Sequence, residues 1–137
     1  MAQPTHVADA SALLAYLNNE EGADALEAIL SNLANSVVVH AANACEVYYD
    51  TLRRYGEATA SATIMKLRSD SVGIREDMDD AFWMEVGALK VSPGGLYFAD
   101  CMGIALARRT GCPLLTADHH EMDKLVGTGV VEIEFVR

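Results

Sequence analysis

The pattern of apolar and polar residues divides the chain into short apolar segments and longer amphipathic ones. The segment Ser36–His40 (SVVVH) is apolar and β-branched nearly throughout, which is typical of a parallel strand covered on both faces. Val130–Phe135 alternates apolar residues with glutamates, which predicts a half-exposed edge strand. Three further strands are predicted at His6–Asp9, Val72–Arg75 and Pro113–Thr116.

Between these strands, apolar residues recur at helical spacing. Asp9 or Ser11 can cap the first helix, and Asn43 is the predicted N-cap of the third. The breaker sequence Ser92–Gly95 separates the last two long helices. The predicted helices cover Ala10–Asn18, Gly22–Leu33, Ala44–Tyr55, Ala58–Ser69, Asp79–Val91, the first part of Leu96–Asp118, and Glu121–Val126. Strands that alternate with helices predict an α/β sandwich with a mainly parallel sheet.

Length and composition limit the class of protein. With 137 residues, the chain is predicted to form one domain, residues 1–137, around one core. A hydrophobic fraction of 51% with 22% charged residues excludes a disordered chain. No apolar run spans a bilayer and MAQPTH has no signal-peptide features, so we expect no membrane association. Cys45, Cys101 and Cys112 lie in apolar contexts without a CxxC motif, which predicts reduced core thiols and a cytoplasmic location.

The formal net charge of −10 argues against a protein that binds nucleic acid through a large basic surface. It is compatible with nucleic-acid chemistry if some of the 20 acidic residues bind divalent cations. Basic residues are adjacent at only two places, and these four are the predicted contacts for the phosphates of a nucleic acid: Arg53, Arg54, Arg108 and Arg109.

Most acidic residues lie in polar clusters, but four stand alone in apolar surroundings. Asp9 and Asp118 follow the ends of two predicted strands. Glu46 and Asp100 lie near the starts of two predicted helices. In a parallel sheet these positions share the carboxyl edge, where open α/β sheets bind their ligands. We therefore expect the four carboxylates to converge.

Helix geometry predicts the orientation of Asp100. At about 100° per residue, Asp100 lies beside the small residues Gly103 and Ala107, which predicts a shallow hollow over its carboxylate. The opposite face is expected to pack in the core and consists of Phe98, Cys101, Met102, Ala105 and Leu106.

Four converging carboxylates repel one another and raise one another's pKa values. Mg²⁺ or Mn²⁺ relieves this repulsion, because hard divalent cations prefer carboxylate and water oxygens. Such a cation can activate water and stabilise the leaving oxygen of a phosphodiester. The hydroxyls of Ser11 and Thr116 can orient a water or a phosphate oxygen. The predicted metal ligands are Asp9, Glu46, Asp100 and Asp118. The predicted catalytic residues are these four acids together with Ser11 and Thr116.

Several of these residues also have a purely structural explanation. Asp9 can be a helix N-cap. Asn43 with Glu46 has the spacing of a capping box, and so has Asp118 with Glu121. For each acid taken alone, capping therefore remains an alternative to metal binding.

Other chemical side chains are equally open to two interpretations. The adjacent histidines His119 and His120 are either transition-metal ligands or solvated loop residues. Three aromatic pairs either stack on bases or pack in a core or an interface: Tyr48–Tyr49, Phe82–Trp83 and Tyr97–Phe98.

At these residues the sequence resembles the PIN-domain family, and in particular the VapC-type toxins of bacterial toxin–antitoxin pairs. VADASALLAYL is similar to the family's opening strand, with Asp9 as the first acid and Ser11 as the hydroxyl. NACEVYYDTLRRYG is similar to the segment that carries the second acid, Glu46. YFADCMGIALARRTGCPLLTAD is similar to the most recognisable block, with Asp100 and Asp118 as the third and fourth acids.

The resemblance implies a three-layer α/β/α sandwich with a parallel sheet of about five strands. It also implies a Mg²⁺- or Mn²⁺-dependent endoribonuclease, usually a homodimer, inhibited by an antitoxin that inserts a segment into the acidic groove. Tyr97–Ala99 stands where the family often has serine or leucine-glycine, and His119–His120 replaces basic residues. These departures bear on the choice of RNA and leave the four acids intact.

Two other functions compete with hydrolysis. One is a binding module without catalysis, in which the acidic groove docks a basic segment of a partner, as the net charge of −10 favours. The other is a phosphoacceptor domain of the receiver type. Against the second, Asp9 has no acidic neighbour, and no lysine follows Val130–Phe135.

Overall fold

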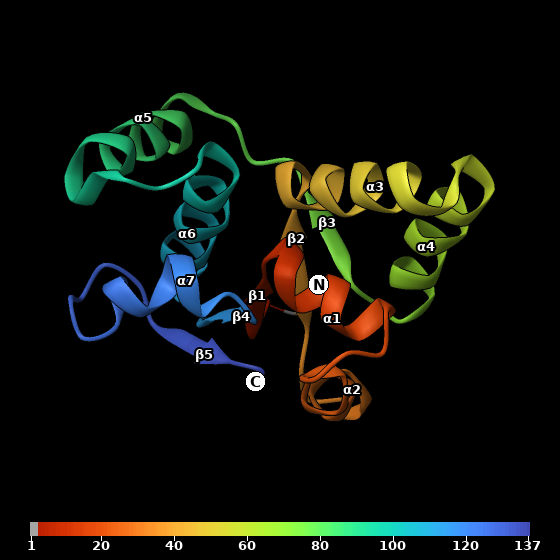
Figure 1. Cartoon of the computed structure of the whole chain (residues 1–137). Helices are drawn as coiled ribbons and strands as arrows, with labels where there is room; N and C mark the ends of the chain where they lie inside the picture. Colours follow the sequence, from red (N-terminus) through yellow and green to blue (C-terminus); the bar gives the residue numbers. More distant parts are fainter. Residues whose placement is uncertain (1–2) are drawn as a thin grey trace.

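The computed structural model describes residues 3–137, and in this part of the chain a five-stranded parallel sheet lies between two layers of helices (Figure 1). The strand order is β3-β2-β1-β4-β5, and every neighbouring pair is parallel. The predicted α/β sandwich is therefore confirmed, with the predicted edge strand at one side. The strands are β1 (His6–Ala8), β2 (Val37–His40), β3 (Gly73–Arg75), β4 (Leu114–Thr116) and β5 (Ile133–Phe135).

Seven α-helices cover the sheet within residues 3–137. A π-helical turn over Lys90–Gly94, interrupted at Ser92, and a 3₁₀ turn over Asp123–Leu125 complete the helical segments. The α-helices are α1 (Ala10–Leu17), α2 (Ala23–Ser31), α3 (Ala41–Tyr55), α4 (Glu57–Ser69), α5 (Asp80–Leu89), α6 (Phe98–Thr110) and α7 (His119–Met122).

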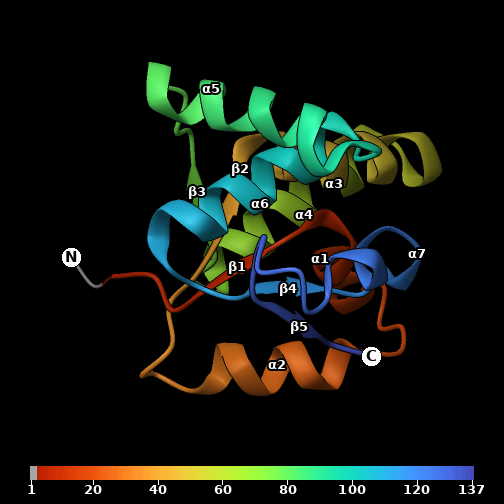
Figure 2. The same ribbon diagram turned by 90° about the vertical axis from the view of Figure 1, so that its left-hand side faces the viewer.

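Alternate residues of the strands feed two separate cores, one on each face of the sheet, because side chains along a strand point to opposite faces. Val7, Val38 and Leu114 pack against α5, α6 and α7. Val39 and Leu115 pack against the layer of α1 to α4. Figure 2 shows α5 and α6 on one side of β4 and β5, and α2 on the other. Both faces of SVVVH are thus buried, as the apolar run predicted.

Helix α3 begins earlier than predicted. Its N-cap is His40, the last residue of β2, whose Nδ1 accepts a hydrogen bond from the Ala42 amide at 3.0 Å. The His40 ring is held in place by Asp77, whose carbonyl oxygen lies 2.9 Å from Nε2, and by stacking on Phe82. The prediction that Asn43 caps this helix was wrong, because β2 runs into α3 without a loop. Asn43 therefore lies inside the helix.

Two predictions of core burial were also wrong. Phe98 is 58% exposed, because α6 starts at this residue and its first turn protrudes beyond the core. Cys45 is exposed on α3, whereas Cys101 and Cys112 are buried as predicted, and all three thiols are free. None of the helices in the described part of the chain is long and apolar enough to cross a membrane.

Candidate active site

The four isolated acids all lie at the carboxyl edge of the sheet. Asp9 follows β1 directly and is the N-cap of α1. Asp118 lies two residues beyond β4 and is the N-cap of α7. Glu46 lies in the second turn of α3, which leaves β2, and Asp100 lies in the first turn of α6. Because all five strands are parallel, their carboxyl ends share one edge, and the helix starts that carry Glu46 and Asp100 meet there.

These carboxylates lie within electrostatic reach of one another. Burial raises the pKa of Asp100 to about 7, and the charges of Asp9, Glu46, Glu121 and Asp118 add to the rise. Burial also raises the pKa of Glu46, with further contributions from the Asp9 and Asp118 charges. The pKa of Asp9 is raised by burial, against the opposing effect of its hydrogen bonds. The four acids therefore interact electrostatically at this edge, Glu121 interacts with Asp100, and their role as one site stays a prediction.

A chain of hydrogen bonds joins the two turns that carry Asp9 and Asp118. The Asp118 amide donates to Thr116 Oγ1 at 3.1 Å, and Thr116 Oγ1 lies 3.1 Å from Ser11 Oγ. Ser11 donates to Asp9 Oδ1 at 2.7 Å and accepts from the Ala117 amide. Since the single Ser11 hydrogen is used on Asp9, Thr116 is the donor between the two hydroxyls.

This network changes the interpretation of the two hydroxyls. Thr116 is fully buried, and its hydrogen and that of Ser11 are both directed to protein atoms. They therefore position the two acid-bearing turns, and their contact with a water or a phosphate stays a prediction.

Capping explains two of the four acids and only in part. Asp9 Oδ1 accepts from the Ala12 amide at 2.9 Å, and Asp118 Oδ1 accepts from the Glu121 amide at 3.1 Å. Each cap uses one carboxylate oxygen. Glu46 is six residues into α3 and is no part of a cap, and α6 has Tyr97 as its N-cap residue, which excludes that role for Asp100. The structural alternative therefore fails for Glu46 and Asp100.

Asn43 ties the helix of the second acid to the helix of the third. Its side chain is 1% exposed, and Nδ2 donates to the Ala99 carbonyl at 3.0 Å, next to Asp100. Its Oδ1 has no hydrogen-bond partner and lies against Gly103, where an added Cβ would be 2.9 Å away. The hollow predicted beside Gly103 is therefore filled by Asn43. No feature of the local sequence pattern marks this contact, because α3 and α6 are far apart in the chain.

A family model described as PIN domain matches residues 7–126, which is most of the chain. The chain belongs to the PIN domain family. No curated protein matches it.

Solved structures similar to this PIN domain include three related to toxin–antitoxin systems. The sarcin-ricin loop cleaving toxin VapC20 of Mycobacterium tuberculosis is 18% identical, with a TM-score of 0.71 over 95% of this chain and 99% of the other. A toxin–antitoxin complex from Klebsiella pneumoniae is 19% identical, with a TM-score of 0.71 over 93% of this chain and 95% of the other. DNA-bound VapBC from Salmonella typhimurium is 15% identical, with a TM-score of 0.72 over 98% of this chain and 99% of the other. At these identities the likeness concerns the fold.

The predicted arginines of this PIN domain pair with acidic residues other than the four isolated acids. Arg53 and Arg54 pair with Asp50 near the end of α3. At the end of α6, Arg108 pairs with Glu85, and Arg109 pairs with Asp77 and Asp79. All four arginines are thus engaged in ion pairs, and their contact with RNA stays a prediction.

Two lysines that the sequence pattern did not single out contact the turn that leads into α6. Lys90 Nζ donates to the Leu96 carbonyl at 2.6 Å, and Lys124 Nζ donates to the Gly95 carbonyl at 2.9 Å. Both carbonyls belong to the turn that leads into α6. Lys124 also lies 3.6 Å from Glu121 Oε2, so one of these lysines lies beside an acid that affects Asp100.

The histidines that follow Asp118 have a structural role in part. His119 stacks on Phe135 with ring centroids 4.0 Å apart, Nδ1 lies 2.7 Å from Asp123, and Nε2 lies 2.7 Å from the Arg137 carbonyl. Both ring nitrogens of His119 are thus in use. His120 has a side chain 92% exposed, which agrees with the solvated alternative.

The donor set at the acidic edge fits a hard divalent cation in its chemistry, because the side chains that raise the pKa of Asp100 are all carboxylates. Within residues 3–137, no three His, Cys, Asp or Glu side chains are gathered closely enough to hold a metal ion as they stand. Mg²⁺ commonly takes one or two carboxylates directly and keeps several waters. The separation of the acidic side chains is therefore compatible with a cation that some of them contact through water, and the ligand roles stay a prediction.

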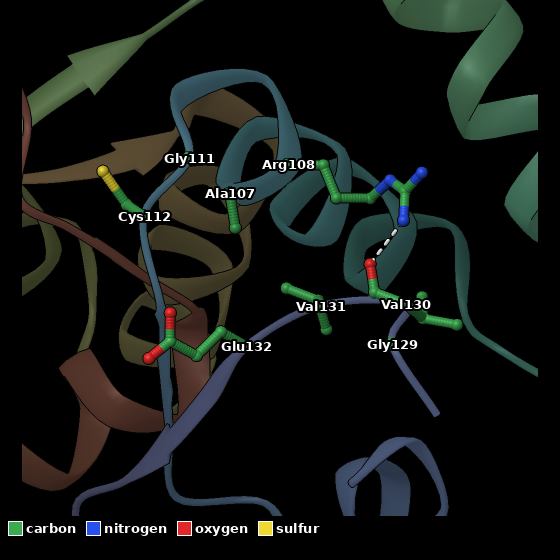
Figure 3. A pocket seen from close by; sticks show the side chains of 8 residues that line it. All are labelled: Ala107, Arg108, Gly111, Cys112, Gly129, Val130, Val131 and Glu132. Carbon is green, nitrogen blue, oxygen red and sulfur yellow. Dashed lines mark hydrogen bonds between the residues drawn. The ribbon is translucent and has the colours of Figure 1, made fainter. Parts of the chain in front are cut away.

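A cavity of about 340 Å³ lies at the other end of α6 from Asp100 (Figure 3). Arg108 crosses its rim to the Val130 carbonyl, and Cys112 and Glu132 lie at its other side. Asp100 and Ala107 are seven residues apart, about 10 Å along a helix. This cavity is therefore separate from the acids.

Replacing Gly103 by alanine is expected to lower the free energy of unfolding by about 1 kcal/mol. The added methyl group would overlap Asn43 Oδ1, which is held by its bond to Ala99. Overpacking costs about 1–3 kcal/mol, and the higher helix propensity of alanine offsets about 1 kcal/mol of this.

Urea unfolding of Gly103→Ala, Asn43→Ala and the double variant measures this contact. We expect the double variant to be at least about 0.5 kcal/mol more stable than the sum of the single effects, because the shorter side chain makes room for the methyl group. If the two single effects on the free energy of unfolding add strictly, the added methyl group does not clash with the Asn43 side chain.

Proposed function

We propose that this PIN domain is a Mg²⁺- or Mn²⁺-dependent endoribonuclease, the toxin of a toxin–antitoxin pair. The observation that carries the proposal is the electrostatic coupling of four carboxylates from separate segments at one sheet edge: Asp9, Glu46, Asp100 and Asp118. Membership of the PIN domain family supports it, and so does the likeness of the fold to a toxin that cleaves the sarcin-ricin loop.

In this proposal the four acids bind the cation, and hydrogen bonds hold two of them in place. Asp9 and Asp118 are fixed by their caps and by the Ser11–Thr116 hydrogen bonds. When bound, the cation supplies a Lewis acid that activates water and stabilises the leaving oxygen of the phosphodiester. The partial burial of Asp100 lowers the local dielectric response, which strengthens the attraction of the carboxylate for a divalent cation.

The partners in this proposal are an RNA substrate, an antitoxin and a second copy of the chain in a cytoplasmic homodimer. A net charge of −10 favours an antitoxin segment that is basic, because an arginine can compete with the cation for the carboxylates. The Klebsiella pneumoniae structure is itself a toxin–antitoxin complex, which supports an antitoxin partner here. Arg53, Arg54, Arg108 and Arg109 are the proposed secondary contacts to RNA phosphates.

The test is incubation of the purified protein with total RNA in Mg²⁺, in Mn²⁺ or in chelator, followed by mapping of the cleaved ends. We expect discrete cleavage sites that appear only with a divalent cation. Intact RNA in both metals, with protein shown to be folded, would contradict the nuclease and favour the acidic-groove binding module without catalysis.

A further inference from the structure

We propose that Glu121 is a fifth carboxylate of the cation site, and that Lys124 is a resident counter-charge with which the divalent cation competes. This inference rests on the proposed function, because it concerns the same site. It stands on the place of Glu121 in the first turn of α7, three residues after Asp118, with its side chain buried and one oxygen without a partner.

The usual structural reason for a glutamate at this position is absent. In a capping box, the N-cap side chain bonds the amide three residues later, and the glutamate there bonds the N-cap amide in return. Asp118 makes the first bond to the Glu121 amide, but the Asp118 amide donates to Thr116 Oγ1 instead. The Glu121 carboxylate is thus left out of the cap.

Nothing in the described part of the chain hydrogen-bonds Glu121 Oε2, although the residue is only 9% exposed. The nearest cation on this oxygen is Lys124 Nζ at 3.6 Å, which is beyond hydrogen-bond distance, and Lys124 already donates to the Gly95 carbonyl. On the other oxygen, His120 lies at 3.7 Å and is largely exposed. A buried carboxylate with such loose partners is costly unless a closer cation satisfies it.

The surroundings of Glu121 point to a divalent cation as that partner. Its charge is among those that raise the pKa of Asp100, so the two carboxylates belong to one electrostatic cluster. Lys124 can offset one negative charge at most, whereas the cluster contains five carboxylates. Hard divalent cations prefer this all-oxygen donor set. The position of Glu121 also extends the site along α7, toward the turn before α6 that Lys124 contacts.

The test measures Mn²⁺ binding to the full chain by isothermal titration, without RNA. Glu121→Gln is expected to weaken Mn²⁺ binding about tenfold or more, as loss of a supporting ligand in a metal site typically does. Lys124→Met is expected to tighten Mn²⁺ binding, because it removes a competing positive charge. Glu132→Gln, an exposed glutamate next to β5, is the matched control and should bind as the wild type does.

The outcomes separate this inference from its alternatives. Unchanged Mn²⁺ affinity in Glu121→Gln would overturn the role of Glu121, and unchanged affinity in Lys124→Met would overturn the competition by Lys124. Equal losses in the two variants would show that the pair only supports the fold. Unfolding temperatures in chelator verify that each variant is folded. If Glu121→Gln is unstable, the direction of the change in Mn²⁺ affinity in Lys124→Met decides the test. If the wild type binds Mn²⁺ in this pattern but cleaves no RNA, the proposed function fails and the inference stands.

Discussion

Replacing Asp100 by asparagine is expected to reduce RNA cleavage at least about 100-fold. Loss of a residue that only supports a metal ligand costs about 10- to 100-fold, so loss of a ligand itself is expected to cost more. Asparagine keeps the size of the side chain and removes its charge, and the first turn of α6 does not depend on the carboxylate as a cap. Loss of cleavage would therefore report on the cation site and not on the helix.

The same substitution is expected to make the metal-free protein more stable at neutral pH. The folded-state pKa of Asp100 is about 7, above the ordinary value of about 3.9 in an unfolded chain. The folded state therefore binds the proton more tightly, and stability falls as the pH rises from about 4 to about 7. A neutral asparagine avoids this loss. After allowance for solvent screening of a partly exposed group, we expect a gain of about 1–3 kcal/mol at pH 8.

Thermal unfolding in chelator at pH 8 and pH 5 checks the sign, because the gain should shrink to about a third at pH 5. Adding Mn²⁺ should then stabilise the wild type more than Asp100→Asn, since binding to the folded state raises its stability. Asp24→Asn, at an exposed acid on α2, is the control and should change neither property. A less stable Asp100→Asn protein in chelator would mean that the carboxylates do not repel one another in the way described.

Replacing Leu106 by alanine is expected to lower the free energy of unfolding by about 2–5 kcal/mol. This is a large part of the total of about 5–15 kcal/mol that is typical of a domain. Leu106 is fully buried in α6, in the core that contacts β1, β2 and β4. Removing three carbon atoms there leaves a cavity that neighbouring side chains fill only in part.

Phe98→Ala is the matched comparison on the same helix. Both residues belong to the face that helical periodicity predicts as buried, but Phe98 is mostly exposed and should cost only about 0.5 kcal/mol. Urea unfolding of both variants at low protein concentration measures the difference. Similar losses for Phe98→Ala and Leu106→Ala would show that the first turn of α6 is buried in solution, for instance against a second copy of the chain.

The acidic edge was predictable to a large extent because each acid carries its own local signal. Asp9 and Asp118 follow apolar strands directly, and Asp100 stands in an apolar helix, so the parallel arrangement alone brings them together. Glu121 was missed as a member of the cluster, because its spacing from Asp118 is also that of a capping box. Only the bond from the Asp118 amide to Thr116 removes that explanation.

Errors of prediction arose where a contact joins distant segments. The start of α3 depends on His40, whose ring is fixed by Asp77 and Phe82 from beyond β3. The face of α6 beside Gly103 is closed by Asn43, which lies about 60 residues earlier. Helical periodicity describes which residues share a face, but it does not state what packs against that face.

Periodicity and chain direction are local properties, so the amino-acid pattern was enough to predict the succession of strands and helices along the chain, their parallel pairing and the sheet edge at which the four acids lie. Contacts between distant segments determine which hydroxyls donate to protein atoms and which lysine lies beside Glu121. They also show which of the acids cap helices. The physical reason is that a buried polar group is defined by its partners, and partners such as Thr116 for Ser11 come from distant parts of the chain.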